Sequence, residues 1–283
     1  MTARLRLTLM LAPVLAVIGL LFGGGLFLGF LQSLHAMPGD AGPTLDAYHA
    51  VLGSRAFLGA LGFSLYIALT ATLLSAVIAV GAALLLRQTF VGRGLIAFLF
   101  QINLTIPHVV GAIGILYLFS QSGSFARLAA GIGLLDRPAQ FPALIYDRNA
   151  IGIILHYVWK EVPFIGLVLL SQMQTIGQEY EAAARSLGAN RWQCFAHVTL
   201  PLIAPGLIAA SVIVFAFSFG AYEVPLLLGP NAPAALPVLA YRAYVDVDLA
   251  ARPQAMAMAM VIALISAALI LIALRAARTA LRR

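Results

Sequence analysis

Long apolar stretches alternate with short polar segments along this chain. A helix needs roughly 20 apolar residues to cross a hydrocarbon layer about 30 Å thick, so stretches of that length with few or no charges predict membrane-spanning helices. The stretches that meet this requirement are approximately Leu7–Leu34, Phe57–Leu86, Leu95–Ser120, Asn149–Gln172, Leu202–Leu228 and Ala255–Leu274. The pattern therefore predicts an all-α integral membrane protein with six transmembrane helices.

The first apolar stretch follows Arg4 and Arg6, an arrangement that signal peptides share. Its apolar run is much longer than the roughly 7 to 15 residues of a signal-peptide core, and no small-residue cleavage site follows it. We therefore expect this stretch to remain in the protein as a helix.

The composition excludes several classes of protein. Only 10% of the residues are charged and 62% are hydrophobic, whereas soluble domains carry about 25% charged residues. The single cysteine, Cys194, excludes a disulfide framework, and the scattered histidines form no H-E-x-x-H motif. We expect no catalytic residues and no metal site.

The net charge of +7 is divided unequally between the polar segments. The two termini with the second and fourth connections carry ten arginines and two glutamates, a balance of +8, whereas the other connections carry six arginines and six aspartates. Because basic residues are retained on the cytoplasmic side, both termini are predicted to be cytoplasmic. The basic excess thus indicates topology, and no nucleic-acid partner is expected.

The fourth connection, residues 173–201, is long and polar for so hydrophobic a chain. Its alanine-rich part, Glu179–Leu187, predicts a short helix, and Gly188 is a residue type that ends helices in a left-handed conformation. Trp192, Phe195 and Val198 then define a second short amphipathic segment. We predict a helix, a turn and a helix on the cytoplasmic face, with Pro201 starting the next span.

This connection resembles the cytoplasmic loop of the membrane subunits of ATP-binding cassette (ABC) importers, which carries the pattern E-A-A-x(3)-G-x(9)-I-x-L-P. The spacing from Gly188 to Val198 and the Leu-Pro pair match. Ala182 stands where the family has its glutamate, and Glu181 lies one place earlier, about 100° around a helix. Whether Glu181 makes the family's acidic contact is therefore left open. The residues that the resemblance assigns to an ATPase-coupling loop are Glu181, Ala182, Ala183, Gly188, Ala189, Arg191, Leu200 and Pro201.

Two further stretches, Thr44–Tyr48 and the pair Ser64 and Leu65, resemble the periplasmic lead-in of this family. The segments Tyr157–Phe164 and Phe219–Pro225 resemble its polyamine (spermidine/putrescine-like), opine and phosphonate branch. The resemblance implies the type I ABC importer permease fold. It would comprise a first helix with a periplasmic lead-in over residues 1–56, a core of five helices over 57–275, and a basic cytoplasmic tail over 276–283.

The resemblance also implies function and partners. In that family the loop forms a coupling helix in a groove of a cytoplasmic ATPase, whose closure on ATP drives the spans between inward-open and outward-open states. No G-x-x-x-x-G-K-[ST] motif occurs here, so ATP and Mg would be bound by the partner, and this chain is expected to bind no cofactor itself. The expected partners are an ATPase dimer, a second permease chain, identical or sister, a periplasmic solute-binding protein and lipid. The expected location is the bacterial inner membrane.

Lys160, Glu161 and Glu223 are the ionisable residues other than histidine that fall inside the predicted spans. Charges in hydrocarbon are costly, so each is a candidate for the translocation path or its gating, together with Tyr157 and Tyr222. For Lys160 and Glu161 a structural salt link is the alternative to solute contact. For Glu223 the alternatives are exposure to water at the span's end and a path acid that favours a cationic solute.

Three prolines, Pro107, Pro163 and Pro225, lie inside or near the ends of the third, fourth and fifth spans and are expected to kink them. Two other classes remain open. One is an ion-coupled secondary transporter that uses Glu161 and Glu223. The other is a membrane enzyme, for which a polar catalytic cluster is missing from the sequence.

Overall fold

The computed structural model describes residues 3–37, 42–176 and 179–280, and over these ranges all regular secondary structure is helical. The α-helices are α1 (Ala3–Ile18), α2 (Gly24–Ser33), α3 (Asp46–Gly53), α4 (Arg55–Leu86), α5 (Arg93–Ile102), α6 (His108–Phe119), α7 (Ser124–Gly131), α8 (Ile151–Ile176), α9 (Glu179–Ser186), α10 (Arg191–Cys194), α11 (Leu200–Gly220), α12 (Glu223–Leu228), α13 (Leu236–Tyr244) and α14 (Arg252–Ala280). Short π-helices cover Gly19–Gly23 (η1) and Phe195–Thr199 (η4), and 3-10 turns cover Asn103–Thr105 (η2), Pro138–Gln140 (η3) and Leu249–Ala251 (η5). The predicted all-α fold is confirmed.

Six helical segments are long and apolar enough to cross a membrane, as the sequence predicted. They are Met10–Ser33, Arg55–Leu86, His108–Gly131, Ile151–Ile176, Arg191–Gly220 and Leu249–Ile272. Their outward faces carry large exposed apolar side chains such as Leu73 and Val77. This is the arrangement expected where the surrounding solvent is lipid.

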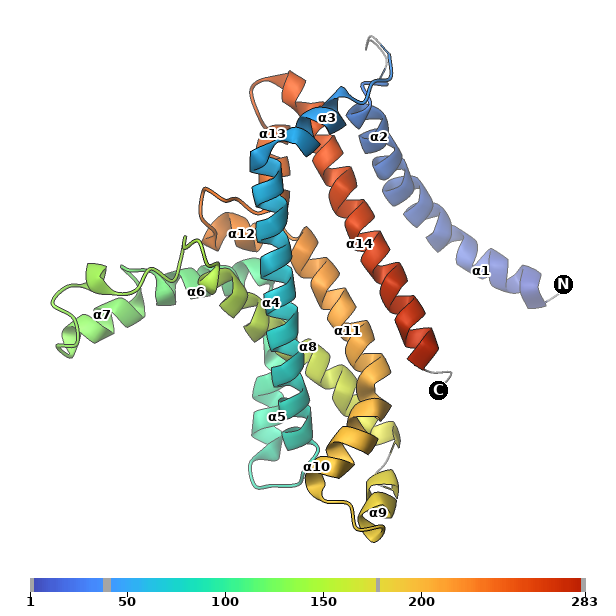
Figure 1. Cartoon of the computed structure of the whole chain (residues 1–283), viewed down its shortest axis with the longest axis vertical. Helices are drawn as coiled ribbons and strands as arrows, with labels where there is room; N and C mark the ends of the chain where they lie inside the picture. The colour runs from blue at the N-terminus through green and yellow to red at the C-terminus, as the bar shows by residue number, and fades with distance from the viewer. Residues whose placement is uncertain (1–2, 38–41, 177–178, 281–283) are drawn as a thin grey trace.

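Helix α4 is the central element of the bundle and packs against α8, α11 and α13 (Figure 1). Its inward face is built from small residues, including Ala68, Ala71, Ala79 and Ala83, none of which has exposed surface. Small residues let helix backbones approach closely, which is how apolar helices associate in a membrane. Helix α4 contributes to all three hydrophobic clusters and so ties the two ends of the bundle together.

The third predicted span, Leu95–Ser120, is wrong as a single helix. The chain forms α5, then η2, and α6 leaves the break in a different direction (Figure 1). Pro107 lacks an N–H and disfavours helical geometry in the preceding residue, and Ile106 is accordingly extended with ψ 124°. The helical segment long enough to span here is His108–Gly131, which joins α6 and α7.

The fifth predicted span, Leu202–Leu228, is wrong at both ends. The helical segment begins at Arg191, because α10, η4 and α11 are continuous, so Pro201 lies near the start of α11 and inside the longer segment. A π turn directly before Pro201 accommodates a residue that has no N–H to donate. At the other end, Gly220 is the last residue of α11, and Pro225 sits in the separate helix α12. Pro163, in contrast, lies within the unbroken helix α8.

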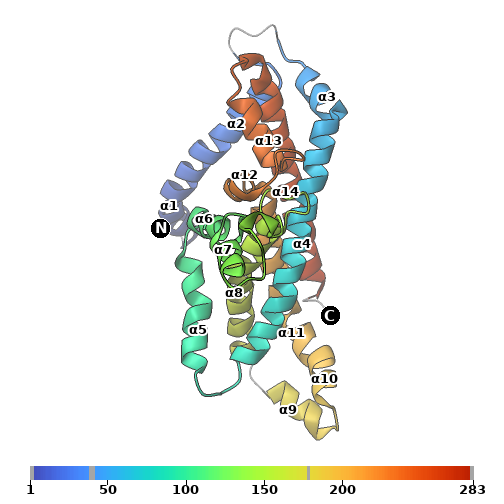
Figure 2. The ribbon, with the colours of Figure 1, turned by 90° about the vertical axis from the view of Figure 1, so that its left-hand side faces the viewer.

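The first helix, α1–η1–α2, touches the bundle through α2 and α14, and α1 leans away from it (Figure 1). Both terminal helices direct their free ends toward the end of the molecule that carries α9, which we call the α9 end (Figures 1 and 2). The lead-in contains α3. Of the predicted basic tail, residues 276–280 continue α14 and residues 281–283 lie outside the described residues.

Candidate functional site

The segment from α9 to η4, which we call the coupling segment, forms the extremity of the molecule at the α9 end (Figures 1 and 2). Gly188 follows α9 with φ +90°, the left-handed conformation that ends many helices and that glycine adopts without strain. Asn190 then starts α10 by accepting a hydrogen bond from the Gln193 amide at 2.9 Å, while the Gln193 side chain caps Asn190 in return. Residues close together in the sequence thus determine both where α9 ends and where α10 begins. Residues 177–178 of the predicted loop lie outside the described residues.

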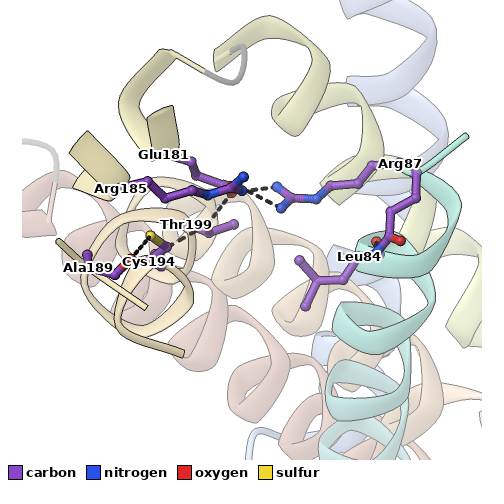
Figure 3. Close-up of polar contacts among 8 residues, drawn as sticks. Leu84, Arg87, Glu181, Arg185, Ala189, Cys194 and Thr199 are labelled. Carbon is purple, nitrogen blue, oxygen red and sulfur yellow. Dashed lines mark hydrogen bonds and ion pairs between the residues drawn. The ribbon is translucent and has the colours of Figure 1, made fainter. Parts of the chain in front are cut away.

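Glu181 points into the protein and is only 7% exposed. The two terminal nitrogens of Arg87, at the end of α4, donate to its carboxylate oxygens at 2.6 and 2.9 Å (Figure 3). This bidentate geometry is the strongest form of arginine–carboxylate pairing. It fastens the coupling segment to the end of the central helix.

Two more donors complete the environment of Glu181. Thr199, in η4, donates to Oε1 at 2.5 Å, and Arg185 donates to Oε2 at 3.2 Å from one turn further along α9 (Figure 3). The hydrogen bonds from Arg87 hold the pKa of Glu181 below its ordinary value, and the Thr199 hydroxyl acts in the same direction against the opposing effect of burial. Glu181 is therefore charged at neutral pH and joins α4, α9 and η4.

The remaining residues assigned to the coupling loop line its outer side. Ala182, Ala183, Gly188, Arg191 and Pro201 are exposed. Ala189 and Leu200 are half-buried. Large apolar side chains project from the same segment, with Leu187 89% and Trp192 73% exposed. An exposed apolar and aromatic surface of this kind is typical of a protein contact.

Sequence reasoning missed Arg87 and Thr199. The sequence analysis used Arg87 only as one of the basic residues that indicate topology, because its partner, Glu181, lies 94 positions away in the chain. Thr199 lies inside the matched loop pattern at a position that the pattern leaves unspecified. A pocket of about 350 Å³ lies between the end of α4 and the coupling segment, with Arg87, Glu181, Arg185 and Arg191 among its lining residues.

A second polar cluster lies inside the bundle, where the break between α5 and α6 meets α8. The ammonium group of Lys160 donates to the carbonyl oxygens of Asn103 at 2.7 Å and Ile106 at 2.6 Å. The Asn103 side chain donates in turn to the Trp159 carbonyl. The backbone groups freed by the helix break are thus satisfied by α8, as they must be away from water.

The structural salt link to another group, considered from the sequence for Lys160 and Glu161, is formed by neither residue within the described ranges, and Lys160 is bound to backbone carbonyls instead. Glu161 is 7% exposed and makes no hydrogen bond or ion pair with any described residue. Both side chains line a pocket of about 280 Å³ with Thr105, Pro107 and His108. Because this ionisable side chain lines a pocket inside the bundle and has no hydrogen-bond donor among the described residues, Glu161 is the strongest candidate here for contact with a solute.

The other predicted path residues separate into two environments. Tyr157 has no exposed surface and packs in the hydrophobic core. Tyr222 is 38% exposed and stacks on Tyr241 with ring centroids 5.2 Å apart. Glu223 is half-buried at the first turn of α12, a helix that packs on α6 and α8, and has no hydrogen-bond partner among the described residues.

Histidines provide no metal site in the described ranges. His108 and His156 contact each other through ring nitrogens 3.3 Å apart, but no group of three or more histidine, cysteine or acidic side chains comes together there. His156 is fully buried beside Gly111, where an added Cβ would lie 3.0 Å from its ring and 2.8 Å from Trp159. This contact is therefore a packing feature of α6 on α8.

Solved structures show where this fold occurs. The chain is similar to one from the crystal structure of a bacterial ABC transporter involved in the import of the acidic polysaccharide alginate, with TM-score 0.79 and 22% identity over 97% of this chain and 95% of that one. A chain of the bacterial alginate ABC transporter in complex with alginate pentasaccharide-bound periplasmic protein gives TM-score 0.76 at 22% identity, over 95% of this chain and 92% of that one. These two similarities show the fold of the chain, an all-helical membrane-protein bundle.

The family described as "Binding-protein-dependent transport system inner membrane component" matches residues 71–283. The chain belongs to this family, so it is a multi-pass inner-membrane protein and a transport subunit rather than an enzyme.

The curated relatives are named for several different solutes. The chain is 28% identical to the sulfate transport system permease protein CysT of Escherichia coli over 53% of this chain and 50% of the relative. It is 31% identical to the probable ABC transporter permease protein y4oQ of Sinorhizobium fredii over 70% of this chain and 65% of the relative. It is 29% identical to the trehalose transport system permease protein SugA of Mycobacterium tuberculosis over 74% and 68%, respectively. Against CysT and y4oQ the match thus spans between half and two thirds of the relative's length.

Proposed function

We propose that this chain is the permease subunit of an ATP-driven importer that moves a small polar solute across the bacterial inner membrane, with the α9 end and both termini in the cytoplasm. The observation that carries the proposal is the coupling segment: a short helix braced to the end of α4, with an exposed apolar surface, in a member of this family. A rigid element on two spans can transmit a rigid-body motion.

The energy source under this proposal is a separate ATPase dimer that binds ATP and Mg and contacts the coupling segment. Two permease chains, identical or sister, form the pathway, and a periplasmic solute-binding protein delivers the solute. Support comes from the missing nucleotide-binding motif and from the alginate transporter, which was crystallised with its periplasmic protein. Differential affinity of the ATPase for two permease conformations then shifts their populations.

The solute that we propose is a small cation such as a spermidine- or putrescine-like polyamine, from the branch that the sequence resembles. Glu161 and Glu223 outnumber Lys160 inside the bundle, and Lys160 is engaged by backbone carbonyls. An oxyanion such as the solute named for CysT would meet net negative charge here. Related opine or phosphonate solutes of the same branch fit this charge less well than a polyamine does.

A second candidate is ion-coupled secondary transport through Glu161 and Glu223. The unpartnered, buried carboxylate of Glu161 favours it, because such acids carry protons or cations in ion-coupled transporters. Uptake into vesicles separates the two mechanisms. An importer of the proposed kind requires ATP and its ATPase, whereas a secondary transporter follows an imposed proton or sodium gradient without ATP.

The experiment that tests the proposal removes residues 181–188 and follows co-purification of the ATPase together with solute uptake. Because this deletion takes away most of α9 and its brace to Arg87, we expect both association and uptake to be lost. Insertion of the variant in the membrane is checked by its monodisperse elution in detergent. An ATPase that still co-purifies with the deletion variant would contradict the proposed coupling.

A further inference from the structure

The carboxylate of Glu181 has no free acceptor position. A carboxylate offers about four lone-pair positions on its two oxygens. In this chain Arg87 occupies two of them, and Thr199 and Arg185 occupy one each (Figure 3). A basic side chain of a partner could bind Glu181 only by displacing these donors, so Glu181 is an internal brace rather than a contact for the ATPase.

The pocket beside this brace is basic. Arg87, Arg185 and Arg191 line it with one acid, Glu181, which leaves a charge of +2. The side chain of Arg185 is 61% exposed, and only one of its nitrogens donates to Glu181. The side chain of Arg191 makes no hydrogen bond or ion pair with the residues that the structure describes. Because a guanidinium carries five N–H donors, most of the donors of these two arginines are free.

We propose that this pocket, defined by Arg87, Arg185 and Arg191, receives a carboxylate side chain of the ATPase subunit, with Arg185 and Arg191 as its hydrogen-bond donors. The inference rests on the proposed function and names the chemistry of the contact. Arginine binds carboxylates in a planar, bidentate geometry, and a cavity of about 350 Å³ has room for an acidic side chain. Arg87 and Glu181 then act as positioning residues, because they hold α9 and η4 around the pocket.

The position of the pocket favours a protein carboxylate over a lipid phosphate. Helix α9 forms the tip of the molecule in both views, and α10 leads from it back toward α11 (Figures 1 and 2). Trp192 follows Arg191 directly and is 73% exposed, and Leu187 is 89% exposed. Aromatic, apolar and arginine side chains together form the usual centre of a protein interface. The partner surface that fits them is acidic with an apolar margin.

The test compares binding of the ATPase that co-purifies with the wild-type chain to three forms of the full-length permease in nanodiscs of neutral phosphatidylcholine. They are wild type, the double variant Arg185→Gln/Arg191→Gln, and Arg93→Gln as a control. Arg93 lies at the same end of the molecule but outside the pocket, and bonds the Leu86 carbonyl. The double variant should bind about tenfold more weakly and lose much of the salt dependence of binding. The control should match wild type.

A second variant guards against a folding artefact. Arg191→Glu changes one exposed side chain without a partner among the described residues, so it should leave the melting temperature unchanged yet slow association with the ATPase. Equal affinity and salt dependence for wild type and the double variant would overturn the inference. It would also be overturned if the variants differed from wild type only when the nanodiscs contained anionic phosphatidylglycerol, since the occupant would then be a lipid. In either case the 181–188 deletion still tests the importer function separately.

Discussion

Arg87 and Glu181, 94 positions apart in the chain, form a bidentate ion pair with nitrogen–oxygen distances of 2.6 and 2.9 Å. The pair joins the C-terminal end of the central helix α4 to the first turn of α9. The acid nearest to the family's glutamate position therefore faces this chain's own arginine. Movement of α9 is tied to movement of α4.

Substitution of Arg87 by glutamine should increase local unfolding of α9 while the helical bundle stays folded. The substitution removes two of the four hydrogen bonds to the buried Glu181 carboxylate. Each such bond contributes about 1.5–3 kcal/mol to the free energy of folding. Hydrogen–deuterium exchange of the α9 amides at pH 7 should rise by at least tenfold. The Arg93→Gln variant serves as the control, because Arg93 does not contact Glu181. Equal α9 exchange in Arg87→Gln and wild type would show that the pair carries no stability.

The contribution of Glu181 should depend on pH in a defined direction. Its pKa is held below the ordinary value by the Arg87 hydrogen bonds, so the folded state favours the charged form. The stabilisation is fully present above the unfolded pKa of about 4.3 and is lost as the pH falls through the lower folded value. The difference in melting temperature between wild type and Glu181→Gln should therefore be constant from pH 8 to about pH 5 and shrink below that. A difference that grew with acidity would contradict this assignment.

Gly188 should tolerate asparagine better than valine. Nothing lies within 4 Å of a Cβ built at this position, so the constraint is the φ of +90° and not space. Asparagine visits left-handed conformations more readily than a β-branched residue does. Gly188→Val should impair uptake at least tenfold and Gly188→Asn much less. Gly133→Val is the matched control, since Gly133 has φ +77° and equally open surroundings outside the coupling segment. Equal loss in both valine variants would assign the effect to general destabilisation.

Lys160→Met should destabilise the bundle. The substitution keeps a side chain of similar length but leaves the Ile106 carbonyl without a donor, at about 1–3 kcal/mol, whereas the Asn103 carbonyl still accepts from the Ile106 amide at 3.2 Å. Lys160→Gln, which retains an N–H donor, should lose less. The measurement is the melting temperature of the detergent-solubilised protein, which should fall in the order wild type, glutamine, methionine. Equal stability of the three forms would show that water, and not Lys160, supplies the hydrogen bonds to the backbone carbonyls between α5 and α6.

Neutralising the acids inside the bundle should slow uptake of a cationic solute. Glu161→Gln and Glu223→Gln keep the size of the side chain and remove the charge that attracts a cation. Each should reduce putrescine uptake by about tenfold, a loss of 1.4 kcal/mol, while ATPase co-purification is retained. Asp136→Asn, at an exposed loop position, is the control. Unchanged uptake in both variants would show that neither acid contributes to transport of the cationic solute.

The sequence predicted the number of spans because each requires a continuous apolar run, which lipid imposes directly. It predicted a kink at Pro107 but still treated Leu95–Ser120 as one span, because the apolar run continues unbroken across the proline where the structure ends α5 and starts α6. Gly188 was found because its role is local. Arg87 was not, because the pairing of Arg87 with Glu181 depends on how α4 and α9 meet, and the orientation of Glu181 depends on the same contact.

The continuous helical segment of α10, η4 and α11 connects the two polar regions of the chain, and it changes direction between α10 and α11 (Figure 1). It spans 30 residues from Arg191 to Gly220, about 45 Å at 1.5 Å per residue. One end borders the arginine pocket, and the other stops three residues before Glu223. Helix α11 alone contributes 21 residues, about 31 Å, so each degree of tilt of α11 displaces its far end by about 0.5 Å. A tilt of a few degrees imposed through α10 would therefore shift the start of α12 by about 1–2 Å.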